Sequence, residues 1–470
     1  MANAVASSSR EGRPARNRSS MHSLHQFNPH DPGVVVTRAL TAGQRPTHVR
    51  NDTIKIINQY ELKRKVGKGQ HGEVYLAEDS IKGYMLAVKC LRRKNKNDRL
   101  NKLRRSYQQP LPRSPNSAQL GDTEHKIRKE IAIMKKLNHP HIVRLLEVVD
   151  DPLQDKIYMV MEYLGGGEIK WRSRNDNPLL RVDQTRRICR DVILGLEYLH
   201  YQGIIHRDIK PANLLWSSDR RTVKITDFGV STFSYAQRLA AAGKGNIKED
   251  DRDPILMDES DLSKTAGTPM FLAPEIVADV SFTAEQSSST VHLPHLPSPQ
   301  QLSRKKPQIT KAIDIWAFGV TLYGLLFGVL PFHAKNEFEI YKVIRWQTWE
   351  PLETMGLDEI PTCARFRKRE GEDTEETEGS LVIDLLERLM EKDAKKRITL
   401  DQVKRHPWIT FDLDRPDIWI RETTLTKYLQ LRPTQAETST AMVPLRFHWL
   451  PKIGRLLTTT LKNVKPQRSF

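Results

Sequence analysis

Cysteine is scarce in this sequence, and its few cysteines lie far apart. Cys90, Cys189 and Cys363 are the only ones in 470 residues, and none has another at metal-ligand spacing. This excludes a disulfide-rich secreted scaffold and a cysteine-based metal site, so we expect reduced, mostly structural thiols. A cytoplasmic protein is predicted, and basic runs along the chain leave a nuclear location open.

Long apolar segments are lacking too. No stretch approaches the roughly 18 apolar residues of a membrane span, and the N-terminus MANAVASSSREGRPARNRSS has no apolar centre of a secretory signal. We expect a soluble chain with no membrane span. The Arg- and Ser-rich beginning faintly resembles a mitochondrial transit peptide, although tails without fixed structure commonly have this composition.

Acidic residues are outnumbered by basic ones. The chain has 75 Lys and Arg against 57 Asp and Glu, a net charge of +18. This balance is compatible with a nucleic acid, an anionic membrane or an acidic protein as partner. No nucleic-acid-binding motif is visible, so we predict no nucleic-acid partner. Hydrophobic residues make up 38% of the chain, which is enough for a sizeable core.

The periodicity of apolar residues divides the chain. Residues 1–50 are rich in Ser, Arg and Pro without any period, so this N-terminal tail is expected to be disordered. Alternating apolar residues with glycines predict three antiparallel strands over 60–89. Helical spacing predicts a helix over 125–137, strands follow over 141–149 and 156–164, and the remainder is mainly helical.

Low-complexity segments interrupt this pattern. They are basic and proline-dotted over about 92–122, acidic at the centre of 234–263, and rich in Ser, Pro and Gln over 281–309. Because packed structure could not be built from such compositions, we expect three surface insertions. The insertions interrupt one predicted domain over 58–410. A regulatory tail is predicted over 411–470.

Three glycines have the spacing of a G-x-G-x-x-G motif. Gly67, Gly69 and Gly72 fall between two predicted strands, where the lack of a β-carbon lets the backbone approach a triphosphate. The motif alone is weak, since it also occurs in dinucleotide-binding folds, and the glycines could simply serve a turn. Its place in a hairpin that continues to Val74 favours an ATP-binding loop.

A lysine ends the third predicted strand. Lys89 in Leu86-Ala87-Val88-Lys89 could extend to the surface, or it could hold the α- and β-phosphates of ATP. In the second case a carboxylate must fix its ammonium group. Glu130, beside the apolar stripe of the predicted helix, is the preferred partner, and Glu124 is the weaker candidate.

The string His206-Arg207-Asp208-Ile209-Lys210-Pro211-Ala212-Asn213 has the residue types that phosphoryl transfer requires. Asp208 would orient a substrate hydroxyl and accept its proton, and Lys210 would neutralise charge on the moving phosphoryl group. Asn213 and Asp227, the latter in an Asp-Phe-Gly sequence, would ligate Mg²⁺ through oxygen atoms. We therefore predict ATP and Mg²⁺ as the cofactors.

The order of these motifs is identified as that of the protein kinase superfamily, over roughly residues 58–410. The resemblance implies an α+β, two-lobed kinase fold, with an antiparallel β-sheet in the N-lobe, a mainly helical C-lobe and ATP in the cleft between them. The ATP-binding residues that it implies are Val66, Gly67, Lys68, Gly69, Gly72, Val74, Ala87, Lys89, Met161, Glu162, Leu164 and Glu168.

Further positions resemble structural parts of this family. Lys210 together with Thr268 is similar to the pattern of serine/threonine kinases rather than tyrosine kinases. Asp314 resembles a buried aspartate that braces the catalytic loop. Arg397 resembles an arginine that pairs with Glu275 of the Ala-Pro-Glu motif.

The chain resembles the calcium/calmodulin-dependent protein kinase kinases in more detail. The basic, proline-containing insert before Glu130 and the sequence Leu262-Ser263-Lys264-Thr265-Ala266-Gly267-Thr268-Pro269 are both similar to theirs. The resemblance implies that the substrates are other kinases, of the calmodulin-dependent and AMP-activated types, phosphorylated on activation-loop threonines. The insert is a docking surface for them or a merely solvated loop.

The activation loop departs from a common pattern. Lys264 stands where many regulated kinases have a phosphorylatable threonine, and lysine cannot supply a negative charge to Arg207. We therefore expect activity without phosphorylation at that position. Ser263, Thr265 and Thr268 are the candidate regulatory residues.

The end of the chain has a basic amphipathic segment. Apolar residues at helical spacing and basic residues over 452–465 are typical of calmodulin targets, of membrane-surface helices, or of a helix packed on the core. Pro466 and three threonines weaken the helix. A calmodulin-binding segment over 447–470 is predicted, and by resemblance 411–450 would hold an autoinhibitory segment. The candidate calmodulin-binding anchors of the segment 447–470 are Trp449, Ile453, Leu457, Leu461, Val464 and Phe470.

The sequence thus predicts a serine/threonine kinase that phosphorylates other kinases under calcium/calmodulin control. Calmodulin and kinase substrates are the expected partners. A calmodulin-independent activator of AMP-activated-type kinases is the alternative, and a pseudokinase scaffold is a distant one that the intact catalytic motifs disfavour.

Overall fold

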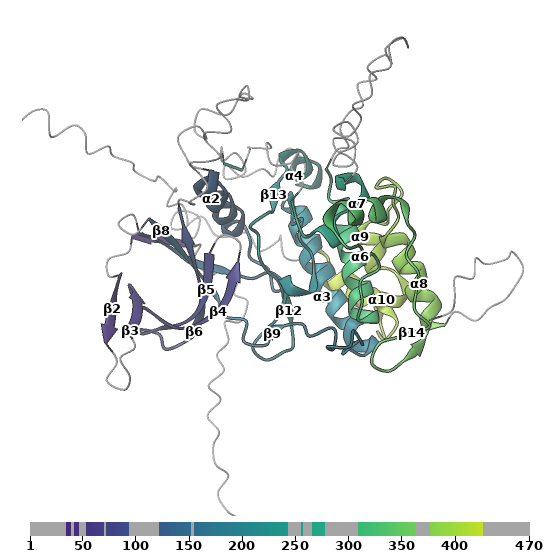
Figure 1. Cartoon of the computed structure of the whole chain (residues 1–470), viewed down its shortest axis with the longest axis horizontal. Helices are drawn as coiled ribbons and strands as arrows, with labels where there is room; N and C mark the ends of the chain where they lie inside the picture. Colours follow the sequence, from purple (N-terminus) through teal and green to yellow (C-terminus); the bar gives the residue numbers. More distant parts are fainter. Residues whose placement is uncertain are drawn as a thin grey trace, which may run out of the picture.

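The computed structural model shows two lobes, a sheet with one helix and a larger body of helices (Figure 1). The described residues are 34–38, 42–46, 53–69, 72–93, 122–151, 155–242, 255–256, 266–277, 309–362 and 377–425.

An eight-stranded sheet forms the N-lobe, with strand order β1-β7-β8-β6-β5-β4-β3-β2. Its main strands are β3 (Thr53–Ile57), β4 (Tyr60–Gly69), β5 (Gly72–Asp79), β6 (Met85–Arg92), β7 (Leu145–Asp151) and β8 (Lys156–Glu162). The three antiparallel strands predicted over 60–89 are confirmed as β4, β5 and β6. In β6 the alternation buries Leu86 and Val88 on one face, where they meet Tyr60 and Val160.

Two strands come from the N-terminal tail. β1 (Val35–Arg38) pairs in parallel with β7, and β2 (Ala42–Pro46) pairs antiparallel with β3. The prediction that residues 1–50 are disordered is therefore wrong for these segments. The overlooked signal is the run of valines over 34–36, whose β-branched side chains favour strands once an edge is available.

Helix α2 (Asp122–Lys135) packs beside the sheet, as predicted for this region (Figure 1). Its apolar stripe, Ile127, Ile131 and Met134, is buried in the main core. Of the insertion expected over 92–122, the two ends belong to β6 and α2, and 94–121 lie outside the described residues.

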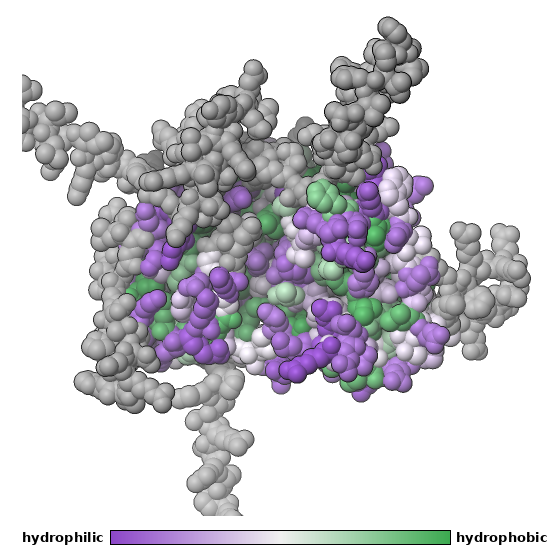
Figure 2. Space-filling view, viewed as in Figure 1, coloured by the Kyte–Doolittle hydropathy of each residue, from purple (hydrophilic) through white to green (hydrophobic). Residues whose placement is uncertain are grey.

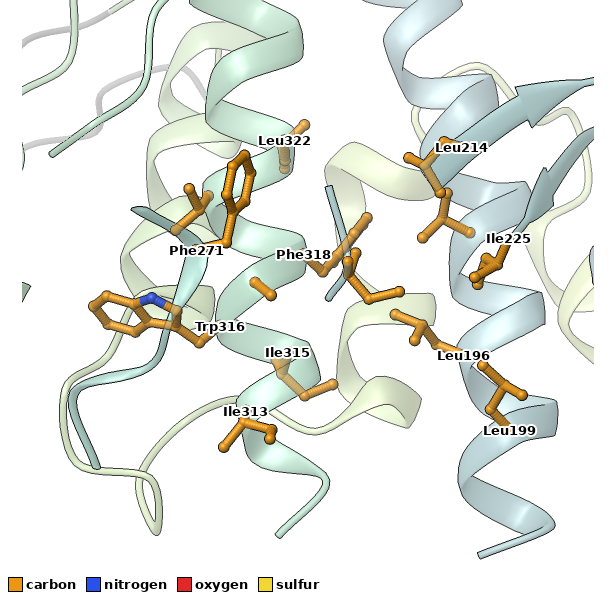
Figure 3. Packing of buried hydrophobic residues seen from close by; sticks show 14 of the residues in the cluster. Leu196, Leu199, Leu214, Ile225, Phe271, Ile313, Ile315, Trp316, Phe318 and Leu322 are labelled. Carbon is orange, nitrogen blue, oxygen red and sulfur yellow. The ribbon is translucent and has the colours of Figure 1, made fainter. Parts of the chain in front are cut away.

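The C-lobe is mainly helical. Its helices are α3 (Val182–Tyr201), α4 (Tyr235–Ala242), α6 (Ala312–Phe327), α7 (Glu337–Trp346), α8 (Glu378–Leu389), α9 (Leu400–Lys404), α10 (Pro407–Thr410) and α11 (Pro416–Glu422). Every residue of α6 after its first is buried, so α6 is the central helix of this lobe. Figure 3 shows side chains of α3, such as Leu196, in the same core as Phe318 of α6.

The surface insertion predicted over 234–263 is wrong at its beginning, because residues 235–242 form helix α4. Arg238 of α4 is buried, lies over the ring of Tyr201 and donates a hydrogen bond of 3.0 Å to the Tyr201 carbonyl. The sequence YAQRLAAA contains strong helix formers, and this propensity outweighs the polar composition that follows it. Most of 243–265 and of the insertion expected over 281–309 lies outside the described residues.

The first part of the tail is packed onto the C-lobe. Trp419 of α11 contacts the main core, and the Lys404 ammonium donates to the Thr423 carbonyl (3.0 Å) and to Glu197 (2.9 Å). Residues beyond 425, and with them the segment predicted to bind calmodulin, lie outside the described part.

The surface shown in Figure 2 mixes hydrophilic and hydrophobic side chains over both lobes. Within the described part of the chain, no helix combines the length and apolar character needed to cross a membrane.

Candidate active site

Short strands carry the predicted catalytic residues of the C-lobe to one place. They are β9 (Gly167–Glu168), β10 (Ile204–Ile205), β11 (Leu214–Trp216), β12 (Val223–Ile225) and β13 (Thr232–Phe233). β11 and β12 form an antiparallel hairpin in which Leu214 faces Ile225. The hairpin therefore puts Asn213 beside Asp227, and the Thr226 amide donates to the Asn213 carbonyl at 2.9 Å.

The loop between β10 and β11 is fixed by a fully buried carboxylate. Asp314 of α6 accepts hydrogen bonds from the backbone amides of His206 (2.9 Å) and Arg207 (2.8 Å). His200 Nε2 lies 2.8 Å from Asp314 Oδ2. Burial alone would raise the pKa of Asp314, but His200, His206 and these amides lower it. Arg207 has a positive φ of 71°, a conformation that this bracing holds in place.

Asp208 is at the centre of a hydrogen-bonded cluster. Its Oδ2 accepts from Lys210 Nζ at 2.7 Å and from Asn213 Nδ2 at 3.0 Å. Its Oδ1 accepts from the amide (2.9 Å) and hydroxyl (2.7 Å) of Thr268. Burial would raise the pKa of Asp208, yet Lys210 and Thr268 outweigh it and lower the pKa. The carboxylate is therefore ionised at neutral pH, as a proton acceptor must be.

Lys89 joins the two lobes. Its Nζ lies 2.6 Å from Glu130 Oε1 of α2 and 3.4 Å from Asp227 Oδ1 of the C-lobe. Burial would lower the pKa of Lys89, but the two carboxylates raise it overall. Glu130 is thus the partner of Lys89, as the sequence favoured. Glu124 binds Arg93 (3.0 Å) and Arg128 (2.7 Å) instead.

Asp227 extends from the hairpin with a positive φ of 64°. The next residue, Phe228, is buried with its ring centroid 5.1 Å from that of His206, which anchors the turn. Burial would raise the pKa of Asp227, and the charges of Lys89 and His206 reverse this and lower it. The Asp227 carboxylate is half exposed, so it is ionised and open to a ligand.

The oxygen atoms of Asp227 and Asn213 fit a hard divalent cation. Asn213 uses its Nδ2 to donate to Asp208, which leaves its Oδ1 for a metal. Among the described residues, no group of three His, Cys, Asp or Glu could hold a metal alone. The two side chains therefore fit Mg²⁺ that takes its other ligands from nucleotide phosphates and water.

The glycine-rich hairpin joins β4 to β5, and residues 70 and 71 at its tip lie outside the described part. A β-carbon on Gly72 would stand 2.0 Å from the Cys90 carbonyl, so this glycine is required by the neighbouring strand. A β-carbon on Gly67 would meet only Val74, at an ordinary contact distance of 3.7 Å. Gly72 is thus a packing requirement whether or not a nucleotide binds, a role that the sequence motif did not indicate.

The segment expected to bind adenine lies where β6 meets β8. Ala87 faces Met161 across this strand pair, and Leu164 follows as a buried residue. The carboxylate of Glu162 is already occupied, because it accepts from Lys224 Nζ (2.8 Å) and from the Arg144 amide (2.8 Å). The Glu162 amide is also occupied, because it donates to the Arg144 carbonyl at 3.1 Å. The side chain and the amide of Glu162 are thus used by the protein itself.

The other residues predicted to bind ATP lie on β4 and β9, and two predicted regulatory residues are not described. Val66 and Lys68 are exposed on β4, Gly69 ends it, and Glu168 is exposed on β9. Ser263 and Thr265 lie outside the described residues.

The predicted pair between Arg397 and Glu275 is present. It is bidentate, with distances of 2.7 and 3.0 Å. His200, Lys224 and Arg93 were missed because only the tertiary fold brings them to their partners.

Comparison with known proteins gives the same family throughout. The family model of the protein kinase domain matches residues 60–409. The chain is 38% identical over 403 residues to serine/threonine-protein kinase ssp1 of Schizosaccharomyces pombe, covering 86% of this chain and 50% of that protein.

Two further relatives extend this comparison. SNF1-activating kinase 1 of Saccharomyces cerevisiae is 40% identical over 373 residues, which are 77% of this chain and 28% of that protein. The calcium/calmodulin-dependent protein kinase kinase of Caenorhabditis elegans is 33% identical over 369 residues, 77% and 54% of the two chains. The chain spans about half of the length of these relatives or less.

Proposed function

The chain belongs to the protein kinase family, and we propose that it is an active, ATP-dependent serine/threonine kinase that phosphorylates the activation loops of other kinases. The observation that carries this proposal is the Asp208 cluster. The ionised Asp208 carboxylate accepts hydrogen bonds from Lys210 and Thr268 and lies next to Asn213 and Asp227. Lys89 of the other lobe contacts Asp227.

The chemistry follows from these positions. Asp208 orients the substrate hydroxyl and accepts its proton as the hydroxyl oxygen bonds to the γ-phosphorus and the bond to ADP breaks. Lys210 offsets the negative charge of the transferring group, and Lys89, held by Glu130, positions the α- and β-phosphates. Mg²⁺ bound by Asp227 and Asn213 would neutralise the β- and γ-phosphate oxygens.

The substrate class rests on the relatives. One is named a SNF1-activating kinase and another a kinase kinase, so both names describe kinases that act on kinases. We propose AMP-activated-type kinases as the first substrate and calmodulin-dependent kinases as the second. The basic insertion between β6 and α2 is proposed as a surface that contacts them.

Calmodulin control is the second candidate. It is favoured by the basic amphipathic stripe over 452–465 and by the relative from C. elegans. The similarity to SNF1-activating kinase 1, whose name mentions a kinase substrate and not calmodulin, favours the alternative, an activator of AMP-activated-type kinases without calmodulin.

One assay separates these possibilities. The full chain, made in a bacterial host and treated with phosphatase, is given Mg²⁺-ATP and a kinase-dead AMP-activated-type or calmodulin-dependent kinase, with and without calcium/calmodulin. Phosphothreonine in the substrate activation loop supports the proposal, and stimulation by calmodulin supports the second candidate. Activity after phosphatase treatment would agree with Lys264 replacing a regulatory threonine. No transfer to either substrate would contradict the kinase-kinase proposal.

A further inference from the structure

A small pocket lies on the C-lobe, away from the catalytic cluster. It has a volume of about 150 Å³ and lies between α3, the β11–β12 hairpin and the tail helix α11. This is below the roughly 300–1,000 Å³ of pockets for drug-sized ligands, so it suits one amino-acid side chain rather than a nucleotide. Its lining residues are Arg187, Arg190, Asp191, Leu194, Trp216, Arg221 and Trp419.

Three arginines and one aspartate line the pocket. Arg187 and Arg221 are exposed, and their charges act on Asp191 and Asp219, respectively. The carboxylate of Asp191 accepts from the Val223 amide at 2.8 Å and lies 3.5 Å from His141, and the nearby charges of Arg187 and Arg190 also act on it. Because Arg187 and Arg221 are exposed, they can also contact an anion at the rim.

A third arginine is fixed at the pocket wall. Arg190 donates to the Ile409 carbonyl at 2.8 Å and pairs with Asp412. Burial, together with the like charge of Arg186, lowers the pKa of Arg190 to about 10. Arg186, Arg187 and Arg190 thus place positive charge along this face of α3, and Asp412 offsets only part of it.

Three residues of the pocket wall are apolar. Trp216 and Trp419 are half-buried and Leu194 is buried. A ligand in the pocket would therefore contact two indole rings as well as the arginines. A carboxylate on a short hydrocarbon stem, next to an apolar side chain, complements both features. Such a group occurs in a protein segment with glutamate or aspartate among apolar residues.

We propose that this pocket is a docking site for an acidic segment of the protein substrate, which inserts one glutamate or aspartate side chain between Trp216 and Trp419 and contacts Arg187 and Arg221. The proposal rests on the proposed function, since it assumes a protein substrate. The charge and the volume of the pocket together fit one acidic side chain of a peptide.

The position of the pocket suits a docking role. Trp216 ends the strand that begins directly after Asn213, so about 10 Å of β11 separates it from the metal-binding residue. A substrate held here remains tethered near the active site, which raises its effective concentration there without touching the reacting atoms. The pocket should therefore lower KM for a folded protein substrate and leave kcat unchanged.

The test compares two double variants of the full chain. Arg187→Glu with Arg221→Glu reverses the charge of the pocket. Lys395→Glu with Lys396→Glu makes the same charge change at exposed residues outside it. Each is assayed on a kinase-dead AMP-activated-type kinase and on a short peptide of its activation loop.

We expect the pocket variant to raise KM for the folded kinase about tenfold or more, with peptide phosphorylation and thermal midpoint as in wild type. The control variant should match wild type on both substrates. Equal KM values for the two variants on the folded kinase would overturn the proposal, as would a parallel loss on the peptide.

A second readout does not depend on catalysis. Overlapping short peptides that cover the substrate kinase and this chain's own acidic runs are immobilised and probed with each variant. Capture of an acidic substrate peptide by wild type and control, but not by the pocket variant, supports the site even if no phosphate is transferred. Capture of none, or of a peptide from this chain in preference, would reject it.

Discussion

At the scale of single residues, burial and ionisation oppose each other at Asp208, Asp227 and Asp314. Burial alone would raise the pKa of each carboxyl group, yet each pKa is lowered by its partners. Those partners are Lys210 for the first, Lys89 for the second and His200 for the third. Three carboxylates therefore remain charged in places that would otherwise neutralise them.

Asp208→Asn is expected to lower kcat by about 10²- to 10⁴-fold, because the amide cannot accept the substrate proton. The measurement is phosphate transfer to a protein substrate at saturating ATP, with the thermal midpoint as a check on folding. Asp414→Asn, at an exposed residue, is the control and should leave kcat unchanged. A kcat within twofold of wild type for Asp208→Asn would rule out this role.

The lowered pKa of Asp314 predicts how the stability of the fold changes in acid. Its folded pKa lies below the unfolded value of about 3.9, so its stabilising contribution is present above that pH and is lost as the pH falls through the folded pKa. The gap in thermal midpoint between wild type and Asp314→Asn should be constant from about pH 5 to 7 and shrink below about pH 4. A gap that widens in acid would show the opposite sign of the pKa shift.

At the scale of elements, the rotation of α2 decides which carboxylate meets Lys89. Glu124 and Glu130 are six residues apart, so at about 100° per residue their side chains point about 120° apart. Only one of them can therefore reach Lys89. Burial of the Ile127, Ile131 and Met134 stripe against the sheet turns Glu130 toward Lys89 and Glu124 toward Arg93.

Glu130→Gln is therefore expected to lower kcat/KM by about 10- to 100-fold, because Lys89 loses the charge that positions it. Glu124→Gln is the matched control on the same helix and should cost less than about threefold. Steady-state kinetics with varied ATP would check both. Equal losses in the two variants would mean that α2 is disturbed as a whole rather than through Lys89.

At the scale of the whole molecule, several contacts tie the lobes together, and two of them involve charged side chains of the predicted nucleotide site. Lys89 of the sheet reaches Asp227 of the C-lobe, and Glu162 between the lobes binds the Arg144 amide and Lys224. The catalytic cluster is therefore complete only when both lobes are folded and joined. The helix α11 adds a contact within the C-lobe, because the Thr423 carbonyl after it accepts from Lys404.

The domain should thus need residues beyond 410 for full stability. A chain ending at 410 loses the Thr423 carbonyl that the buried Lys404 ammonium binds beside Glu197, and losing one hydrogen bond to a charged group costs about 1.5–3 kcal/mol. Thermal melting should give a lower midpoint for this chain than for one ending at 425. Identical midpoints would show that α11 is dispensable, and tests of autoinhibition by deletion should cut beyond 425.

The sequence by itself determined the chemistry and much of the local structure. The catalytic string, the order of the motifs, the strands over 60–89 and helix α2 follow from short-range spacing, which reports which residues share a loop, a face or a turn. The Lys89–Glu130 pair was predictable because helical phase already limits which side chains face the sheet.

Only the tertiary structure decided the rest. The contacts of His200 with Asp314 and of Lys224 with Glu162, the pairing of β1 and β2 with the sheet, and the packing of α4 all join segments distant in sequence. Local periodicity carries no information about such partners. They form because a folded core brings these groups together and because burial makes an unsatisfied charge or backbone amide costly.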